Sequence, residues 1–200
     1  MPDGKSIRAF LAIDPPEEVL RQIGSHQERL KRKIQGTISW VRPRGIHLTL
    51  KFFGDIAPAD VERISRIVEP LAMGTSPLRI EVRKMGVFPG SSRPRVLWMG
   101  MEGDIHPLIV LQKSIEAALE AEGFPREDRP FRPHLTLGRI KTPRGLAGLA
   151  GAMEEAAEWT AGGFVARDLC LFQSDLLPQG AVYTKLASWP FGKERRRDDS

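Results

Sequence analysis

The chain has 200 residues, of which 41% are hydrophobic, and a formal net charge of +5. This length suits one well-buried core, and the single cysteine, Cys170, excludes an intramolecular disulfide and a cysteine-based metal cluster. No apolar run approaches the roughly 18 residues that span a bilayer, and the start lacks the apolar stretch of a signal peptide, so we expect a cytoplasmic protein that does not bind membranes.

The first half of the chain alternates predicted strands and helices. Residues 1–6 carry no apolar periodicity, and we expect them to be disordered. Periodicity and proline breaks then predict a strand at Arg8–Ile13, a helix capped by Asp14 and running to about Lys33, strands near Ser39–Val41 and Ile46–Phe53, a helix from Pro58 to about Leu71, and a strand at Leu78–Val87.

The second half repeats this order. It predicts a strand at Arg95–Gly100, a helix at Asp104–Ala121, a strand that begins at His134, a helix from about Pro143 to Ala157, and a strand at Gly163–Phe172. A last strand, Ala181–Trp189, follows a turn at residues 178–180, and the charged tail, residues 193–200, is expected to be disordered.

The repeated order indicates an internal duplication of about residues 8–88 and 95–172. Phe10 precedes His47 by 37 positions, and Leu97 precedes His134 by the same number. We therefore expect an α+β fold in one domain over residues 7–191, with two lobes related by a pseudo-twofold axis. Antiparallel sheets would line a central cleft, and the helices would lie outside.

The tetrapeptide His-Leu-Thr-Leu occurs twice, at residues 47–50 and 134–137, and holds two of the four histidines. In a strand, each copy would place His and Thr on one face and bury both leucines on the other. The other histidines, His26 and His106, lie on predicted helices, and we expect both to be solvated.

Side-chain alternation extends this prediction to neighbouring residues. In the first motif strand Lys51 would share the cleft face with His47, while Phe52 would enter the core. In the second, Arg139 would point away from the cleft unless the strand breaks at Gly138. Phe10 would face the cleft and offer a stacking surface for a base.

Two histidines with two threonines suit proton transfer around a bound phosphate. The ordinary imidazole pKa of about 6.5 lets His47 and His134 act as base and acid in one turnover. The hydroxyls of Thr49 and Thr136 can hold phosphate oxygens while an arginine counters their charge. The scheme needs no metal, and a rival two-histidine metal site falls short of the usual ligand number.

Positive charge gathers around both motifs. Residues 126–144 carry a local charge of +4 and residues 40–55 carry +2, which together exceed the charge of the whole chain. An anionic partner such as RNA fits this pattern, although an arginine-rich solvated surface would produce it too.

At these residues the chain resembles the 2H phosphoesterase superfamily, named for two His-x-Thr-x motifs, and within it the RNA 2′,3′-cyclic phosphodiesterases once called 2′–5′ RNA ligases. The resemblance runs from about Ile7 to Phe191. It rests on Phe10-Leu11-Ala12-Ile13-Asp14, on Trp40-Val41 with His47-Leu48-Thr49-Leu50-Lys51-Phe52-Phe53-Gly54, on Arg132-Pro133-His134-Leu135-Thr136-Leu137-Gly138-Arg139, and on Phe172-Gln173-Ser174 through Gly180 and Tyr183.

The resemblance implies hydrolysis of a terminal 2′,3′-cyclic phosphate to a 2′-phosphate without metal or cofactor. It assigns proton donation to His47, proton acceptance to His134, phosphate binding to the two motif threonines and a substrate contact to Arg139. Weak reverse 2′–5′ ligation is also implied. We expect a monomer that acts on RNA ends or cyclic nucleotides.

Two other functions are compatible with the sequence. The chain could be a non-catalytic module that binds RNA ends, although lysine or arginine would serve binding better than paired His and Thr. It could also be a related phosphodiesterase whose substrate is 2′–5′ oligoadenylate or an ADP-ribose cyclic phosphate. The sequence does not separate these substrates, because the loops that set base preference have no readable geometry.

Overall fold

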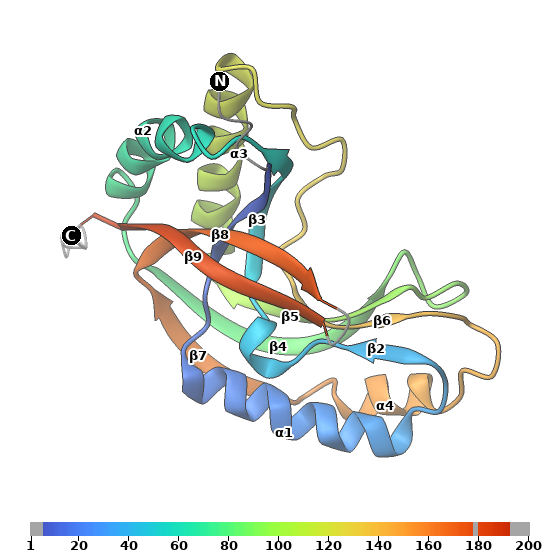
Figure 1. Ribbon diagram of the computed structural model, residues 1–200. Helices are drawn as coiled ribbons and strands as arrows, with labels where there is room; N and C mark the ends of the chain where they lie inside the picture. The colour runs from blue at the N-terminus through green and yellow to red at the C-terminus, as the bar shows by residue number, and fades with distance from the viewer. Residues whose placement is uncertain (1–5, 178–179, 193–200) are drawn as a thin grey trace, which may run out of the picture.

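The computed structural model describes residues 6–177 and 180–192. It contains two antiparallel sheets, one with strand order β3-β1-β8-β9 and the other with order β2-β6-β5-β4-β7 (Figure 1). We call them the first and the second sheet. Their strands are β1 Ile7–Ile13, β2 Ile38–Trp40, β3 Leu48–Ile56, β4 Leu78–Phe88, β5 Val96–Gly103, β6 Leu135–Ile140, β7 Thr160–Ala166, β8 Asp168–Leu177 and β9 Gly180–Pro190. The predicted α+β class and antiparallel sheets are confirmed.

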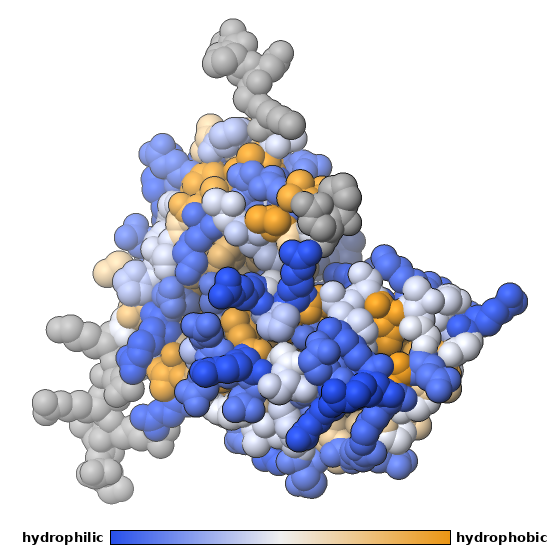
Figure 2. Space-filling model, turned by 60° about the horizontal axis from the view of Figure 1, so that its bottom comes forward, coloured by the Kyte–Doolittle hydropathy of each residue, from blue (hydrophilic) through white to orange (hydrophobic). Residues whose placement is uncertain are grey.

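The helices lie outside the sheets in two groups (Figure 1). Helices α2 (Asp60–Met73) and α3 (Ile105–Ala121) contact each other and pack on β9 and β3 of the first sheet. Helices α1 (Glu17–Lys33) and α4 (Leu149–Glu155) pack on β7 and β4 of the second sheet. A short 3-10 helix, η1 (Pro43–Gly45), leads into the first motif strand. Figure 2 shows hydrophilic side chains over most of the face on which α1 lies.

Each sheet combines strands from both halves of the chain. β4 ends the first half but pairs with β5 of the second half, whereas β8 ends the second half and pairs with β1 of the first. The predicted single strand Gly163–Phe172 is therefore wrong, because the chain leaves the second sheet after Ala166 and enters the first sheet at Asp168. The two halves exchange their last strands, β4 and β8, and neither sheet forms from one half alone.

The internal repeat is offset by one residue from the predicted match. Ala12 lies opposite Thr49 and Trp98 lies opposite Thr136, so these two pairs correspond. Counting along β1 and β5 from them, Phe10 corresponds to Val96, because 12 − 10 = 98 − 96. Phe10 and Leu97 have the same spacing from their motifs, but they are not equivalent in the structure, so the predicted match between them is wrong.

Several local predictions need correction. Pro16 is the N-cap of α1, which has no side-chain cap, and the Asp14 carboxylate lies 3.4 Å from the Lys185 ammonium instead. His26 is 8% exposed and stacks on Trp159 at 3.9 Å, so it is not solvated, whereas His106 is exposed as predicted. Cys170 is buried between the strands of the first sheet. The predicted disordered tail and most of the turn at 178–180 lie outside the described residues, as does all of the predicted N-terminal segment except Ser6.

Among residues 6–177 and 180–192, no helix is both long and apolar enough to cross a bilayer.

A buried ion pair joins the first motif strand to α3. The Lys51 ammonium lies 3.0 Å from the Glu116 carboxylate, and the two side chains are 1% and 6% exposed. Lys51 also donates to the Pro125 carbonyl at 2.7 Å, and the backbone N–H of Glu127 donates to Glu116. These bonds satisfy both charges inside the core, so the loss of either partner would leave the other charge buried without compensation.

We predict that Lys51→Met lowers the free energy of unfolding by about 3–5 kcal/mol, because it leaves the Glu116 carboxylate unpaired. Lys51→Met combined with Glu116→Leu should lose much less, since both charges are then removed. Urea denaturation monitored by circular dichroism measures the difference. Arg66→Ala, which removes only an exposed ion pair with Glu62, is the control and should change stability by less than about 1 kcal/mol. Equal losses in the single and double variants would contradict the prediction.

Candidate active site

The two motifs occupy corresponding positions in the two sheets. His47 directly precedes β3, and His134 directly precedes β6. Thr49 pairs with Ala12 on β1, and Thr136 pairs with Trp98 on β5. Residues that pair directly in an antiparallel ladder project to the same face of a sheet. Each threonine therefore shares its face with a residue of the neighbouring strand.

Both imidazoles are anchored by a backbone carbonyl two residues earlier. In His134 the Nδ1 atom lies 2.6 Å from the Arg132 carbonyl oxygen, and the ring of His47 bonds the Gly45 carbonyl. A carbonyl can only accept, so Nδ1 of His134 donates, and Nε2 of the neutral ring keeps its lone pair. That arrangement leaves Nε2 as the nitrogen that can accept a proton.

The protein environment keeps both imidazoles neutral. Burial lowers the pKa of His47 to about 4, against a smaller opposing effect of its bond to the Gly45 carbonyl. Burial also lowers the pKa of His134; the bond to the Arg132 carbonyl opposes this shift, and the charge of Arg139 adds to it. Both shifts disfavour the imidazolium, so an acid role for either ring needs a nearby negative charge that restores its proton affinity.

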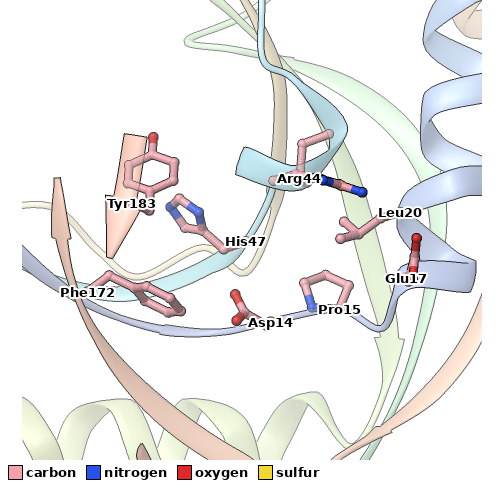
Figure 3. Close-up of a pocket in the computed structure, with 9 residues that line it drawn as sticks. Asp14, Pro15, Glu17, Leu20, Arg44, His47, Phe172 and Tyr183 are labelled. Atoms are coloured by element: carbon pink, nitrogen blue, oxygen red, sulfur yellow. The ribbon is translucent and has the colours of Figure 1, made fainter. Parts of the chain in front are cut away.

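Aromatic rings hold the His47 imidazole in place. It stacks on Phe10 with ring centroids 4.5 Å apart and meets the Tyr183 ring edge-on at 5.0 Å. Figure 3 shows His47 between Tyr183 and Phe172. Phe10 lies beneath the imidazole and is only 2% exposed, so the prediction that it offers an open stacking surface is wrong. Its role here is to support the ring of His47.

The His134 imidazole has a different neighbour. Phe88 meets it edge-on with centroids 5.1 Å apart, and the guanidinium of Arg132 lies over the Phe88 ring, 5.8 Å from its centroid. Phe88 in turn stacks on Trp98 at 4.9 Å. His134 is thus fixed by a carbonyl and an aromatic edge, whereas His47 is fixed by a carbonyl, a stacked ring and an aromatic edge.

A β-bulge at the last leucine of each motif reverses the predicted side-chain faces. Consecutive pairs in the first sheet are Ala12 with Thr49 and Leu11 with Lys51, so Leu50 is the extra residue. Lys51 therefore enters the core, and Phe52, 50% exposed, takes the face of Thr49. Both predictions for this pair were wrong, because alternation assumes a regular strand.

The same bulge occurs in the second motif. Trp98 pairs with Thr136 and Leu97 with Gly138, which leaves Leu137 as the extra residue. Arg139 pairs with Val96 and thereby returns to the face of Thr136. Arg139 was predicted to face the cleft only if the strand were interrupted at Gly138. The strand is interrupted, but the extra residue is Leu137.

Two buried glutamines donate to the carbonyl of the extra residue in each bulge. Gln112 of α3 donates to the Leu50 carbonyl at 3.3 Å, and Gln27 of α1 donates to the Leu137 carbonyl at 2.9 Å. They are 6% and 1% exposed. Gln27 also donates to the Val41 carbonyl at 2.9 Å. Each bulge is therefore held by a side chain from a helix that belongs to the other half of the chain.

Arg139 connects the two halves of the site electrostatically. Its charge lowers the pKa of His134 and acts in the same direction on Tyr183, whose pKa burial raises overall. Arg139 belongs to the second sheet, whereas Tyr183 belongs to the first and touches the His47 ring. The two motifs thus share an environment that contains a guanidinium and a phenol.

Sequence reasoning did not single out Tyr183, Gln27 or Gln112. Tyr183 was part of the family resemblance but had no role, although it is the only tyrosine of the chain. The glutamines gave no signal, because an amide on a helix is ordinarily exposed. Among residues 6–177 and 180–192, no three of His, Cys, Asp and Glu lie together in a group that could hold a metal ion.

Comparison with known proteins places this chain in a family. The model of the LigT-like phosphoesterases matches residues 13–98 and 102–183. The chain belongs to the LigT-like phosphoesterase family. The 2H phosphoesterase resemblance drawn from the two motifs is thereby confirmed.

Relatives of this LigT-like chain are similar over nearly their whole length. An RNA 2′,3′-cyclic phosphodiesterase of Methanothermobacter thermautotrophicus is 35% identical, over 90% of this chain and 96% of its own. One of Thermus thermophilus is 32% identical, over 97% and 95%. A crystal structure of a Thermus thermophilus protein superposes with a TM-score of 0.74 at 30% identity, covering 94% of this chain and all of the other.

We predict that Gln27→Leu lowers kcat more than it raises KM in this LigT-like enzyme, because Arg139 acts on charge that develops in the transition state. The change removes one of the two donors to the Leu137 carbonyl, which keeps the Val41 backbone N–H, and removes the Gln27 donor to the Val41 carbonyl. This should cost about 1–3 kcal/mol of stability and loosen the bulge that turns Arg139. Steady-state kinetics and urea denaturation measure both effects. Gln22→Leu, an exposed position on the same helix, is the matched control. If both variants behave like the wild type, the glutamine does not hold the bulge.

Proposed function

We propose that this chain is a metal-independent RNA 2′,3′-cyclic phosphodiesterase that converts a terminal 2′,3′-cyclic phosphate into a 2′-phosphate. The observation that carries the proposal is the pair of His-Leu-Thr-Leu motifs. In each motif a backbone carbonyl anchors the imidazole. In the second motif the bulge also turns Arg139 to the same face of the sheet as Thr136. The full-length relatives named RNA 2′,3′-cyclic phosphodiesterase support the same activity.

In the proposed mechanism His134 is the base and His47 is the acid. Nε2 of His134 takes a proton from water while the water oxygen attacks phosphorus. The bond between phosphorus and O3′ breaks, its electron pair stays on O3′, and protonated His47 gives that oxygen a proton. The product carries a 2′-phosphate and a 3′-hydroxyl, and solvent resets both imidazoles.

The remaining residues of the proposed site bind the phosphate. The hydroxyls of Thr49 and Thr136 donate to its non-bridging oxygens, and Arg139 offsets the charge that develops on them in the transition state. The phosphate also helps His47, because a negative charge beside a buried imidazole raises the pKa of that group toward neutrality. Substrate binding would thus supply the protonated acid that the free protein lacks.

Two related activities stay open within this proposal. Running the reaction backwards joins a 2′,3′-cyclic end to a 5′-hydroxyl, which gives weak 2′–5′ ligation. A 2′–5′ oligoadenylate or an ADP-ribose cyclic phosphate would present the same phosphorus to the same groups. A purely RNA-binding role is less favoured, because binding alone gives no reason to bury and anchor two neutral imidazoles. We also propose that the protein is a cytoplasmic monomer.

We predict that His47→Ala and His134→Ala each lower kcat by at least about a hundredfold on a 2′,3′-cyclic mononucleotide, because each removes one proton-transfer group. Excess chelator should leave the wild type active, and nuclear magnetic resonance of the product should show phosphate on the 2′-hydroxyl. His106→Ala, which changes an exposed histidine, is the control. Full activity in both motif variants, or a 3′-phosphate product, would rule out the mechanism.

We predict that kcat/KM has a bell-shaped pH profile with its optimum on the acid side of pH 6.5. This parameter reports the free enzyme, in which the pKa of His47 is about 4 and that of His134 is also lowered. The reactive form needs one ring protonated and the other neutral, so it becomes scarce as pH rises above both values. The profile of kcat should lie at higher pH, because bound phosphate favours the imidazolium. An optimum of kcat/KM above about pH 7.5 would contradict these shifts.

A further inference from the structure

The phenyl ring of Phe88 limits how the His134 imidazole can turn. The two rings meet edge-on, with centroids 5.1 Å apart and an interplanar angle of 87°. Protein interiors are close-packed, so a perpendicular imidazole cannot rotate far about its Cβ–Cγ bond without striking the phenyl ring. Phe88 therefore restricts the orientation of the ring that the proposed mechanism uses as its base.

His134 has no stacked ring of the kind that supports His47. The His47 imidazole lies on Phe10, with centroids 4.5 Å apart. In the second sheet the counterpart of Phe10 is Val96, an aliphatic residue. Among residues 6–177 and 180–192, no aromatic ring other than Phe88 contacts the His134 imidazole. The orientation of His134 thus depends on one ring, whereas that of His47 depends on several.

The Phe88 ring is itself held by the indole of Trp98. These two rings stack with centroids 4.9 Å apart and an interplanar angle of 29°. The indole can lie there because Gly86, its partner on β4, has no side chain, and a Cβ atom at Gly86 would lie only 2.2 Å from the indole. Stacked aromatic pairs are favoured beyond the burial of their apolar area, so the indole stabilises one position of Phe88.

Arg132 contacts this pair of rings from both of its ends. Its backbone carbonyl oxygen lies 2.6 Å from Nδ1 of His134, and its guanidinium lies over the Phe88 ring, 5.8 Å from the centroid. Pro133 follows it in the sequence and favours extended backbone at Arg132, which restricts the direction of the carbonyl. Arg132, Phe88 and His134 therefore each contact the other two.

The orientation of the imidazole decides where its proton lies. A neutral imidazole carries its proton on Nδ1 or on Nε2, and the hydrogen bond of one nitrogen sets the choice. The Arg132 carbonyl can accept only a proton on Nδ1, and this bond requires the present orientation of the His134 ring. A ring that turns away loses the bond and can carry its proton on Nε2, which then cannot accept one from water.

We propose that Phe88 is a positioning residue that keeps the proton of neutral His134 on Nδ1. Trp98 and Arg132 in turn hold the phenyl ring in place. This inference rests on the proposed function, in which Nε2 of His134 is the base. The electrostatics agree with it, because burial lowers the pKa of His134 and so favours the neutral ring, the state in which the two tautomers exist.

The test locates the proton by nitrogen-15 nuclear magnetic resonance of the histidine rings. It uses the full chain without substrate at about pH 8, where imidazoles of ordinary or lowered pKa are neutral. The wild type should carry the His134 proton on Nδ1, and the His134→Ala spectrum assigns the signal. Phe88→Leu, which removes the ring but keeps an apolar side chain, should shift the proton toward Nε2. Phe88→Tyr, which restores the ring, should return it to Nδ1.

Phe53→Leu is the matched control. Phe53 is also a partly buried phenyl ring, which meets Phe124 edge-on away from the second motif. The control variant should leave the His134 proton on Nδ1 and the kinetic constants unchanged. On a 2′,3′-cyclic mononucleotide Phe88→Leu should lower kcat about tenfold with little change in KM, because a misplaced base slows proton transfer more than it weakens binding. Phe88→Tyr should restore kcat.

Two further variants disturb the supports of Phe88 and serve as the test if Phe88→Leu fails to fold. Gly86→Ala displaces the indole of Trp98, and Arg132→Gln removes the guanidinium but keeps the backbone carbonyl. Both should move the His134 proton toward Nε2. A higher KM in Arg132→Gln with the proton still on Nδ1 would contradict the part assigned to Arg132 and make its guanidinium a substrate contact.

A proton that stays on Nδ1 in both Phe88→Leu and Gly86→Ala would overturn the proposal, as would a proton that lies on Nε2 in the wild type. Neither result depends on turnover, so the proposed function keeps its own test. Absence of turnover by the wild type, together with a shifted proton in Phe88→Leu, would refute the proposed function and leave the positioning by Phe88 established.

Discussion

The hydrogen bonds from Gln27 and Gln112 to the motif bulges are the constraint on which the site depends. Each bulge shifts one strand by a residue, and that shift decides whether Arg139 or its neighbour faces the phosphate side. The Leu50 carbonyl accepts from Gln112, and the Leu137 carbonyl accepts from Gln27 together with the Val41 backbone N–H. A buried carbonyl that loses a donor destabilises the fold. Because the donors lie on helices of the opposite half, the position of α1 controls the second motif and that of α3 controls the first.

The exchange of β4 and β8 has a similar effect on a larger scale. Each motif strand lies beside a central strand that is itself paired with a strand from the other half. Neither motif can therefore move without disturbing both halves of the chain. The buried pair of Lys51 and Glu116 adds a further link, since it ties the first motif strand to α3. Such interlocking suits a mechanism in which two imidazoles must keep a fixed separation.

Much of the fold and the central residues of the site could be predicted from sequence. The duplicated motif, the helices and most strands follow from periodicity, which is a local property. The sides of the sheets on which Lys51, Phe52 and Arg139 lie depend on the bulges. A prediction from alternation misses a bulge, because it assumes that every successive residue changes side. The burial of Phe10 and His26 depends on rings that are distant in the sequence, Tyr183 on β9 and Trp159 in the loop before β7. In each of these cases the outcome depends on contacts between residues that are far apart in the sequence.

The exchange of β4 and β8 is the arrangement expected when two copies of a shorter protein are joined in one chain. A protein of half this length, with only the first copy of the repeat, would have a last strand, β4, positioned for a sheet that it does not possess. Two such molecules would complete each other by swapping that strand, which is a low-cost route to a dimer. The present chain has the topology of such an intertwined pair joined end to end. Within one chain the two copies need not stay identical, and at corresponding positions the first has Ala12 where the second has Trp98.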